Sequence, residues 1–149
     1  METVFSIVST IIAVTSLLFS LYNYFCGVLH DRKRDTLNAF NILQEQSFDK
    51  LNQYMPAEIR DISKNNKSEE YKKVIGYIAR IEHFCVGVNK KIYDRKTLFE
   101  LAHGYLDGSV IRNRIMPIIE SKKGYYNNIE KVLLWMEAEG KKRSVYTKN

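Results

Sequence analysis

The stretch from Thr3 to His30 contains no Lys, Arg, Asp or Glu, and Asp31-Arg32-Lys33-Arg34 follows it directly. A helix needs roughly 20 mostly apolar residues to cross the hydrocarbon core of a bilayer, and Ile7 to Phe25 supplies about that length. A cleaved signal peptide would have positive charge before a shorter apolar run and an Ala-x-Ala-like site after it, and neither is seen here. The sequence therefore predicts an N-terminal tail and one transmembrane helix within residues 1–30.

The charges that flank this helix predict its orientation. Arg32, Lys33 and Arg34 follow the apolar run, whereas no basic side chain precedes it. The positive-inside rule places such basic flanks in the cytoplasm. We therefore expect a single-pass protein of the cell membrane with its N-terminus outside and residues 31–149 inside. The same three residues are predicted to lie at the membrane interface, in contact with anionic lipid.

Small or weakly polar residues recur along the predicted span at alternating steps of three and four. They are Ser6, Ser9, Ala13, Ser16, Ser20, Asn23 and Gly27. Small residues at this spacing let two helices approach closely in lipid, so this anchor stripe favours a homo-oligomer. The alternative is that small residues are simply common in spans, since Thr3, Thr10 and Thr15 lie off the stripe.

The remaining chain has helical periodicity almost throughout. Apolar residues recur at steps of three and four in residues 37–54, 71–92, 98–119 and 126–136. No segment alternates convincingly with the period of a strand. The predicted fold class is therefore all-α: one N-terminal transmembrane helix, followed by a cytoplasmic bundle of four or five helices. The helical domain is expected to cover residues 31–140, and residues 141–149 are expected to form a basic disordered tail.

Local signals divide this domain into its helices. Pro56 can begin a short helix, the polar residues 63–67 predict a loop, and Ser68 is placed to cap the next helix. Asp94 is a second predicted cap, and the short joint before it favours antiparallel pairing of the helices on either side. Gly104 in the following helix predicts either close packing or a bend.

Four short runs carry a resemblance to a known family. They are Ile81-Glu82-His83-Phe84-Cys85-Val86-Gly87-Val88, Lys90-Lys91-Ile92-Tyr93-Asp94, Val110-Ile111-Arg112 and Pro117-Ile118-Ile119. In order and spacing these runs resemble the bacterial domain-of-unknown-function family 4760, over about residues 31–139. The resemblance implies a helical fold and a membrane anchor, and it provides no catalytic residue because the family has no assigned activity. The chain departs from the family pattern at Cys85, where a small residue is usual, and at Asn113-Arg114, where a tryptophan is expected.

Four residues are weak candidates for a polar site: Glu82, His83, Glu100 and His103. Glu100 and His103 stand at i and i+3, as in half of a carboxylate-bridged di-iron site, but the sequence has no second Glu-x-x-His pair. Glu82 and His83 are adjacent and therefore point to different faces of a helix. No phosphate-binding loop or nucleophile elbow is found either. We therefore expect no metal, no cofactor and no enzymatic activity.

The balance of charge bears on the partner. The chain carries 23 Lys and Arg against 17 Asp and Glu. A nucleic-acid partner is not expected, because such sites interleave basic residues with exposed aromatic ones. The sequence favours a non-enzymatic, membrane-tethered module that self-associates and binds an unknown cytoplasmic protein. Two alternatives stay open: an oligomeric effector that perturbs the membrane, for example in phage defence, and an enzyme of unknown reaction.

Overall fold

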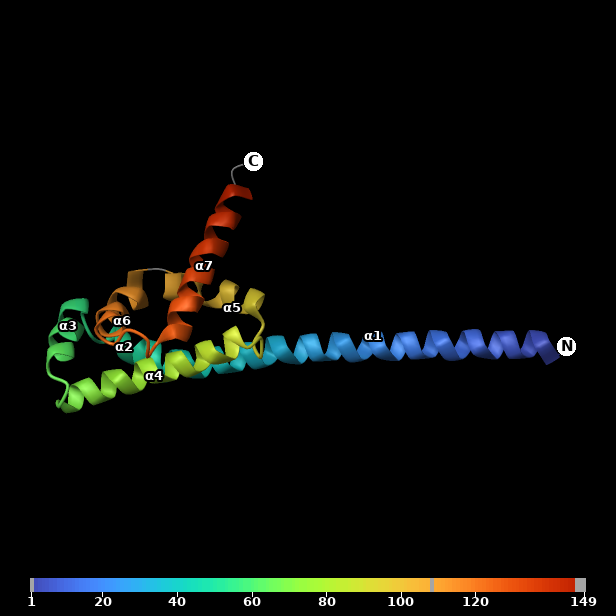
Figure 1. Cartoon of the computed structure of the whole chain (residues 1–149), viewed down its shortest axis with the longest axis horizontal. Coiled ribbons are helices and arrows are strands. Elements are labelled where there is room, and N and C mark those ends of the chain that lie inside the picture. Colours follow the sequence, from blue (N-terminus) through green and yellow to red (C-terminus); the bar gives the residue numbers. More distant parts are fainter. Residues whose placement is uncertain (1, 108, 147–149) are drawn as a thin grey trace.

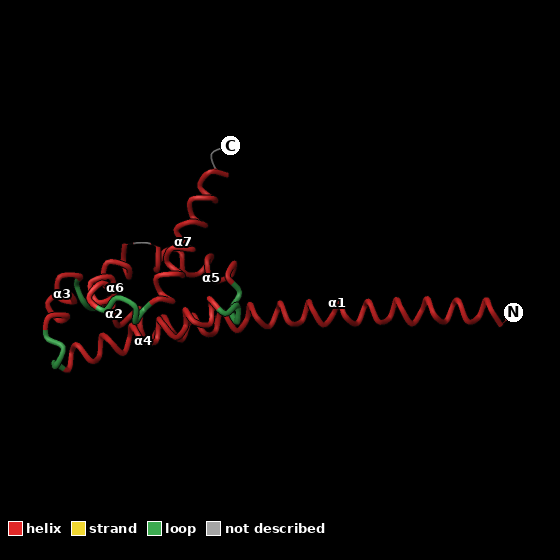
Figure 2. The backbone as a smooth tube through the Cα atoms, viewed as in Figure 1, coloured by secondary structure: helices red, strands yellow, loops and turns green. Residues whose placement is uncertain are grey.

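The computed structural model describes residues 2–107 and 109–146, and every regular element within these ranges is helical (Figure 1 and Figure 2). In chain order the elements are α1 (Glu2–Leu43), the π-helical turn η1 (Gln44–Phe48), α2 (Asp49–Asn52), α3 (Pro56–Lys64), α4 (Glu69–Asn89), α5 (Arg95–Ala102), a second π-helical turn η2 (His103–Asp107), α6 (Ser109–Ser121) and α7 (Asn127–Tyr146). The predicted all-α fold class is confirmed.

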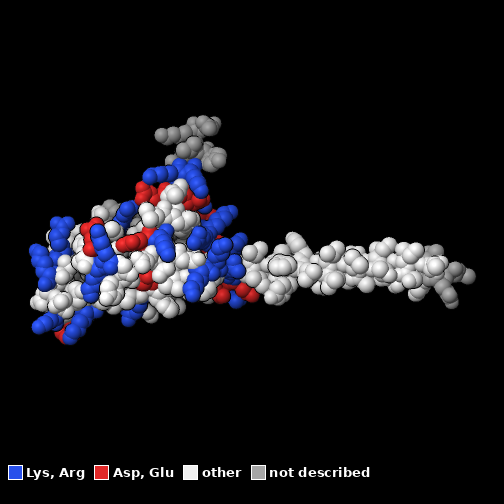
Figure 3. Space-filling view, viewed as in Figure 1, with Lys and Arg blue, Asp and Glu red and all other residues white. Residues whose placement is uncertain are grey.

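The N-terminal half of α1 projects from the other helices as a rod (Figure 1). Its apolar side chains, among them Ile11, Leu18 and Phe25, are exposed, and no residue of its most apolar window is buried. Figure 3 shows this half of α1 free of Lys, Arg, Asp and Glu along its visible surface. By length and composition α1 is able to cross a membrane, and its apolar window lies outside the bundle core.

The C-terminal half of the same helix forms part of the bundle core. Thr36, Phe40 and Leu43 follow one another at steps of four and three, and all three are buried. The Phe40 ring meets the Phe84 ring of α4 edge-on, with 6.5 Å between their centroids. No Pro or Gly interrupts residues 28–55, so the helix passes without a break from the exposed rod into the core.

The core lies between α4, α6 and α7, with α3 covering α6 and α4 packing chiefly along α7. Its fully buried side chains include Val74, Ile78, Ile81 and Val88 of α4, Ile111, Ile115, Ile118 and Ile119 of α6, and Ile129, Val132 and Met136 of α7. Ser68 caps α4 as predicted, because its hydroxyl accepts a hydrogen bond from the backbone N–H of Tyr71 (3.1 Å).

Asp94 caps α5 as predicted, but α4 and α5 do not form the expected antiparallel pair. The Asp94 carboxylate accepts a hydrogen bond from the Thr97 N–H (2.8 Å), whereas the helix itself packs chiefly against α1 and η2. The Asp94 N–H donates to the hydroxyl of Thr36 (2.8 Å), which in turn donates to the Arg32 carbonyl (2.7 Å). This buried hydroxyl holds the start of α5 on α1.

The segment after Asp94 is not one uniform α-helix. α5 ends at Ala102, η2 follows as a π-helical turn, and α6 begins at Ser109. Leu106 of η2 is buried in the core. Gly108 lies outside the described residues.

The last helix is longer than predicted. We expected α7 to end near Gly140 and residues 141–149 to be disordered, but the helix continues through Tyr146. Ion pairs at i and i+4 support the extra turns: Lys141 with Glu137 (2.8 Å) and Arg143 with Glu139 (3.4 Å). The guanidinium of Arg143 also lies 4.1 Å from the ring centroid of Phe99 in α5. Residues 147–149 are outside the described part of the chain.

Glu82 of α4 caps the N-terminus of α7. Its carboxylate accepts hydrogen bonds from the backbone N–H groups of Asn128 (3.1 Å) and Ile129 (2.9 Å), and from the Asn128 side-chain amide (2.7 Å). The amide of Asn89 donates to the Asn128 carbonyl beside it (3.2 Å). A carboxylate at this end of a helix also complements the positive end of the helix dipole.

Glu82→Ala tests this capping role. We expect the substitution to lower the free energy of unfolding by about 1–3 kcal/mol, because two N–H groups at the start of α7 lose their acceptor. Denaturant unfolding of the full chain in detergent, followed by circular dichroism, measures the loss. Glu100→Ala is the matched control and should change little, since Glu100 is exposed on α5. Equal stability of the two variants would contradict the assignment.

Candidate functional site

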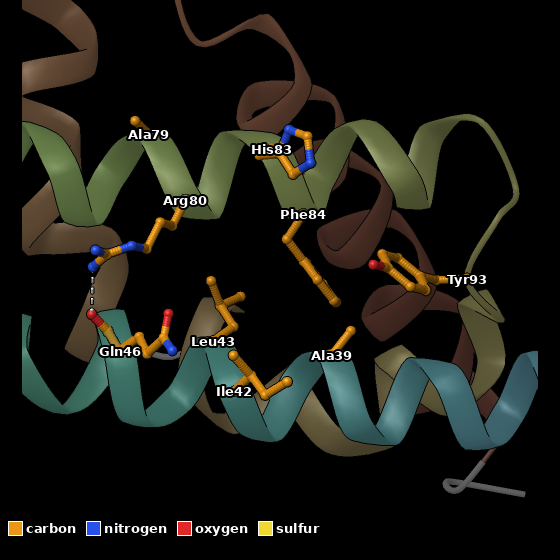
Figure 4. Close-up of a pocket in the computed structure, with 9 residues that line it drawn as sticks. All are labelled: Ala39, Ile42, Leu43, Gln46, Ala79, Arg80, His83, Phe84 and Tyr93. Carbon is orange, nitrogen blue, oxygen red and sulfur yellow. Dashed lines mark hydrogen bonds between the residues drawn. The ribbon is translucent and has the colours of Figure 1, made fainter.

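A groove of about 460 Å³ runs along the surface between α1 and α4 (Figure 4). Its walls are mostly apolar: Ala39, Ile42 and Leu43 come from α1, and Ala79 and Phe84 come from α4. Ala39 and Ala79 are small, and they leave the space that larger side chains at the same positions would fill. Ile42 is 55% exposed, so an apolar edge is open to solvent along the α1 side.

The two ends of the groove differ in character. Figure 4 shows Tyr93 at one end, beside the Phe84 ring with which it stacks at 4.9 Å, and Arg80 and Gln46 at the other. Arg80 donates one hydrogen bond to the Gln46 carbonyl (3.2 Å), and no carboxylate among the described residues lies within ion-pair distance of it. His83 is exposed at the rim one turn further along α4. The polar end is therefore cationic and can accept an anionic group.

The four polar candidates from the sequence do not meet in one site. The Glu82 carboxylate accepts hydrogen bonds from the first backbone N–H groups of α7, and His83 lines the groove. Glu100 is exposed on α5, and the His103 ring in η2 lies 4.8 Å from the Phe99 ring. In the described part of the chain no group of three or more His, Cys, Asp and Glu is placed to hold a metal ion.

The cysteine at the centre of α4 is buried. Desolvation raises the pKa of the Cys85 thiol, and the nearby Glu82 charge raises it further. Because only the thiolate is a good nucleophile, this residue belongs to the core packing. The described lining of the groove brings together apolar surface and the cation of Arg80, an arrangement that suits a ligand with an apolar face and an anionic group.

The predicted membrane-interface residues Arg32, Lys33 and Arg34 lie where the exposed half of α1 ends and its buried half begins. Arg34 pairs with Asp31 (3.1 Å), and both side chains are exposed. Arg32 and Lys33 lie on the side of α1 that faces the α4–α5 turn. Hydrogen bonds from Thr97 and the charges of Lys33 and Arg32 lower the pKa of Asp94, although burial opposes this shift.

The described residues of the anchor stripe lie along the exposed rod. The stripe positions Ser6, Ser9, Ala13, Ser16, Ser20, Asn23 and Gly27 are all exposed. The Ser9 hydroxyl donates to the Ser6 carbonyl (2.9 Å), and the off-stripe Thr15 donates to the Ile11 carbonyl (2.8 Å). The Ser9 hydroxyl is therefore bonded within its own helix, as is that of the off-stripe Thr15.

Neither the groove nor the place of Arg80 at one end of it was predicted from the sequence. The lining residues come from α1 and α4, which are distant from each other in the sequence. Their spacing carries no signal for a groove, because the groove depends on how α1 and α4 pack.

Comparison with known proteins gives the family. A family model described as a domain of unknown function, DUF4760, matches residues 10–133. No curated protein and no solved structure matches the chain significantly. The matched range begins inside the exposed half of α1 and ends within α7, so it includes both the rod and the bundle. The match covers most of the chain and confirms the resemblance found in the sequence: the protein belongs to the DUF4760 family.

Proposed function

We propose that this DUF4760 protein is a single-pass membrane protein, with its N-terminus outside, whose helical domain is a non-enzymatic interaction module on the cytoplasmic side. The observation that carries the proposal is the continuity of α1: one helix has an exposed apolar half and a half that is built into the bundle core. Arg32, Lys33 and Arg34 follow the apolar half directly, which supports the cytoplasmic placement of the domain.

Self-association through α1 is supported by the direction in which the anchor stripe faces. Steps of four and three carry the stripe from Gly27 onward along one side of the helix, to Asp31, Arg34, Asn38, Asn41 and Glu45, all largely exposed. The buried residues Thr36, Phe40 and Leu43 lie about half a turn away, at 3.6 residues per turn. The bundle therefore occupies the side of α1 opposite the stripe. This side of α1 is free for a second copy to pack against.

The groove is the proposed recognition surface for a partner protein. Its length between two helices, its apolar walls and its exposed Ile42 edge suit an amphipathic helix that lays its apolar face between α1 and α4. Arg80 at one end favours an acidic side chain on that helix, because a guanidinium forms charge-assisted hydrogen bonds with a carboxylate. Confinement beside the membrane and pairing of the anchors would raise the local concentration of such a partner.

Substitution in the anchor stripe tests self-association. Ser16→Leu places a large side chain on the stripe, so we expect self-association of the full chain to weaken by about tenfold or more. Thr15→Leu is the matched control, since it makes the same kind of change one position off the stripe. Native mass spectrometry in a mild detergent measures the masses. Wild-type and Thr15→Leu should assemble, and Ser16→Leu should shift towards monomer. An unassembled wild-type, or equal assembly of both variants, would refute the proposal.

Site-specific crosslinking tests the groove. A photo-crosslinking amino acid replaces Ile42 in the full chain, and the protein is irradiated in its host membranes. We expect crosslinks to one partner protein, at a helical segment of that partner that carries Asp or Glu. Arg80→Glu should lower this yield at least about fivefold, because it reverses the charge that the partner meets. The same amino acid at position 134 is the control, since Leu134 is exposed on α7 outside the groove. Crosslinks to lipid or to α1 of a second copy, or equal products at both positions, would contradict a partner helix.

A further inference from the structure

The turn that joins α4 to α5 lies close to the point where the apolar half of α1 ends. The Thr36 hydroxyl, which accepts from the Asp94 N–H at 2.8 Å, is six residues beyond His30. At 1.5 Å per residue this is about 9 Å along the helix axis. The headgroup layer is about 5–8 Å thick on each side of the hydrocarbon core. If α1 spans a bilayer as proposed above, with the hydrocarbon core ending at His30, the last residue of the uncharged stretch, the turn therefore lies at the edge of the headgroups.

Basic side chains from three segments gather at this level. They are Arg32 and Lys33 of α1, Lys90 and Lys91 of the turn, and Lys96 of α5, and we call them the basic collar. Figure 3 shows Lys and Arg concentrated where the bundle meets the rod. Among the described residues none of these five cations is within ion-pair distance of a carboxylate, since Asp31 and Asp35 lie near Arg34 and Asp94 caps α5. The collar therefore presents positive charge towards the end of the rod, with the Asp94 carboxylate close enough to Arg32 and Lys33 for their charges to lower its pKa.

The backbone of the turn holds an apolar side chain outward among these cations. α4 ends in a Schellman motif, with the Ile92 N–H donating to the Gly87 carbonyl (2.9 Å) and the Lys91 N–H to the Val88 carbonyl (3.1 Å). In this motif the residue at the position of Ile92 usually packs on the side chain at the position of Gly87. Here that position has no side chain, and a Cβ there would lie 2.5 Å from the Tyr93 ring, which fills the space. Ile92 is left 60% exposed.

Lys91 itself occupies a position that favours glycine. Its φ is 60°, in the left-handed region that residues with a side chain rarely adopt. Glycine would fit there without strain, so the packing of the bundle gives no reason for a lysine. The side chain instead adds a cation beside Lys90 and Ile92, at the edge of the turn nearest the rod.

We propose that the basic collar and Ile92 form a docking surface for the anionic phospholipid headgroups of the leaflet from which α1 emerges. This inference rests on the proposed function, because it requires α1 to span the membrane. Basic residues bind such a surface only within about a Debye length, roughly 8–10 Å, and the position of the turn meets this condition. Ile92 enters the interface between the headgroups. The contact holds the bundle against the leaflet and so limits the tilt of α1 in the bilayer.

A fluorescent reporter on the turn tests the docking surface. The full chain with Cys26→Ser and Ile92→Cys is labelled with an environment-sensitive dye and placed in nanodiscs of phosphatidylcholine, with or without about 30% phosphatidylglycerol. The remaining Cys85 is buried and protected from the label. We expect a blue shift and about a twofold gain in emission in the anionic discs, lost in about 0.5 M salt. A label at Met55→Cys, 69% exposed near the far end of the bundle, should not respond.

Charge reversal supplies the matched comparison. Lys90→Glu with Lys91→Glu should abolish the response, whereas Lys72→Glu with Lys73→Glu, at the opposite end of α4, should leave it intact. Equal emission from wild-type protein in both kinds of disc, or equal loss in both double variants, would overturn the docking surface. Failure of the membrane anchor is a separate result: the chain would then not enter discs of either composition, whereas failure of this inference alone leaves it incorporated without a lipid-dependent signal.

Discussion

The unbroken backbone of α1 is the constraint on which the rest of the structure depends. From Glu2 to Leu43 each turn is hydrogen-bonded to the next, so the exposed apolar half and the buried half keep a fixed rotational relation. Burial of Thr36, Phe40 and Leu43 determines which side of the helix carries the bundle. The side of α1 opposite these buried residues is exposed to solvent along the whole helix. A flexible linker between rod and bundle would remove this relation, and with it any fixed direction for the groove.

The Thr36 hydroxyl is the second element that this arrangement needs. It connects the Arg32 carbonyl to the Asp94 N–H, and so it brings α5 and the preceding turn onto α1 at the level where the rod begins. The groove begins at Ala39, one helical turn after Thr36. At its Tyr93 end it is lined by the connection between α4 and α5. The proposed lipid contact and the proposed partner site are therefore neighbours on one rigid junction. Loss of the lipid contact is therefore expected to alter partner binding, and loss of the partner to alter the lipid contact.

Sequence patterns predicted the features that depend on neighbouring residues and missed those that depend on distant ones. Ser68 and Asp94 were predicted as caps because a cap needs only the next three residues. The predicted pairing of α4 with α5 was wrong, because a hydrogen bond from Asp94 to Thr36 holds α5 on α1 instead. The two residues are 58 positions apart, so no local pattern indicates this contact. Glu82 was a candidate for a polar site, but its partner is the start of α7, 46 positions away. The groove had no local signal, since it arises only from the way α1 packs beside α4.

The central claim is that the free face of α1 is one continuous surface for a second copy, from the bilayer to the bundle. Single cysteines placed along residues 31–45 of the full chain, in a Cys26→Ser background and in native membranes, test it by thiol crosslinking. Strong dimer formation is expected at Arg34→Cys, Asn38→Cys and Asn41→Cys, and weak formation at Lys33→Cys and Ala39→Cys. A pattern without helical period, or one strongest at Ala39→Cys, would contradict it.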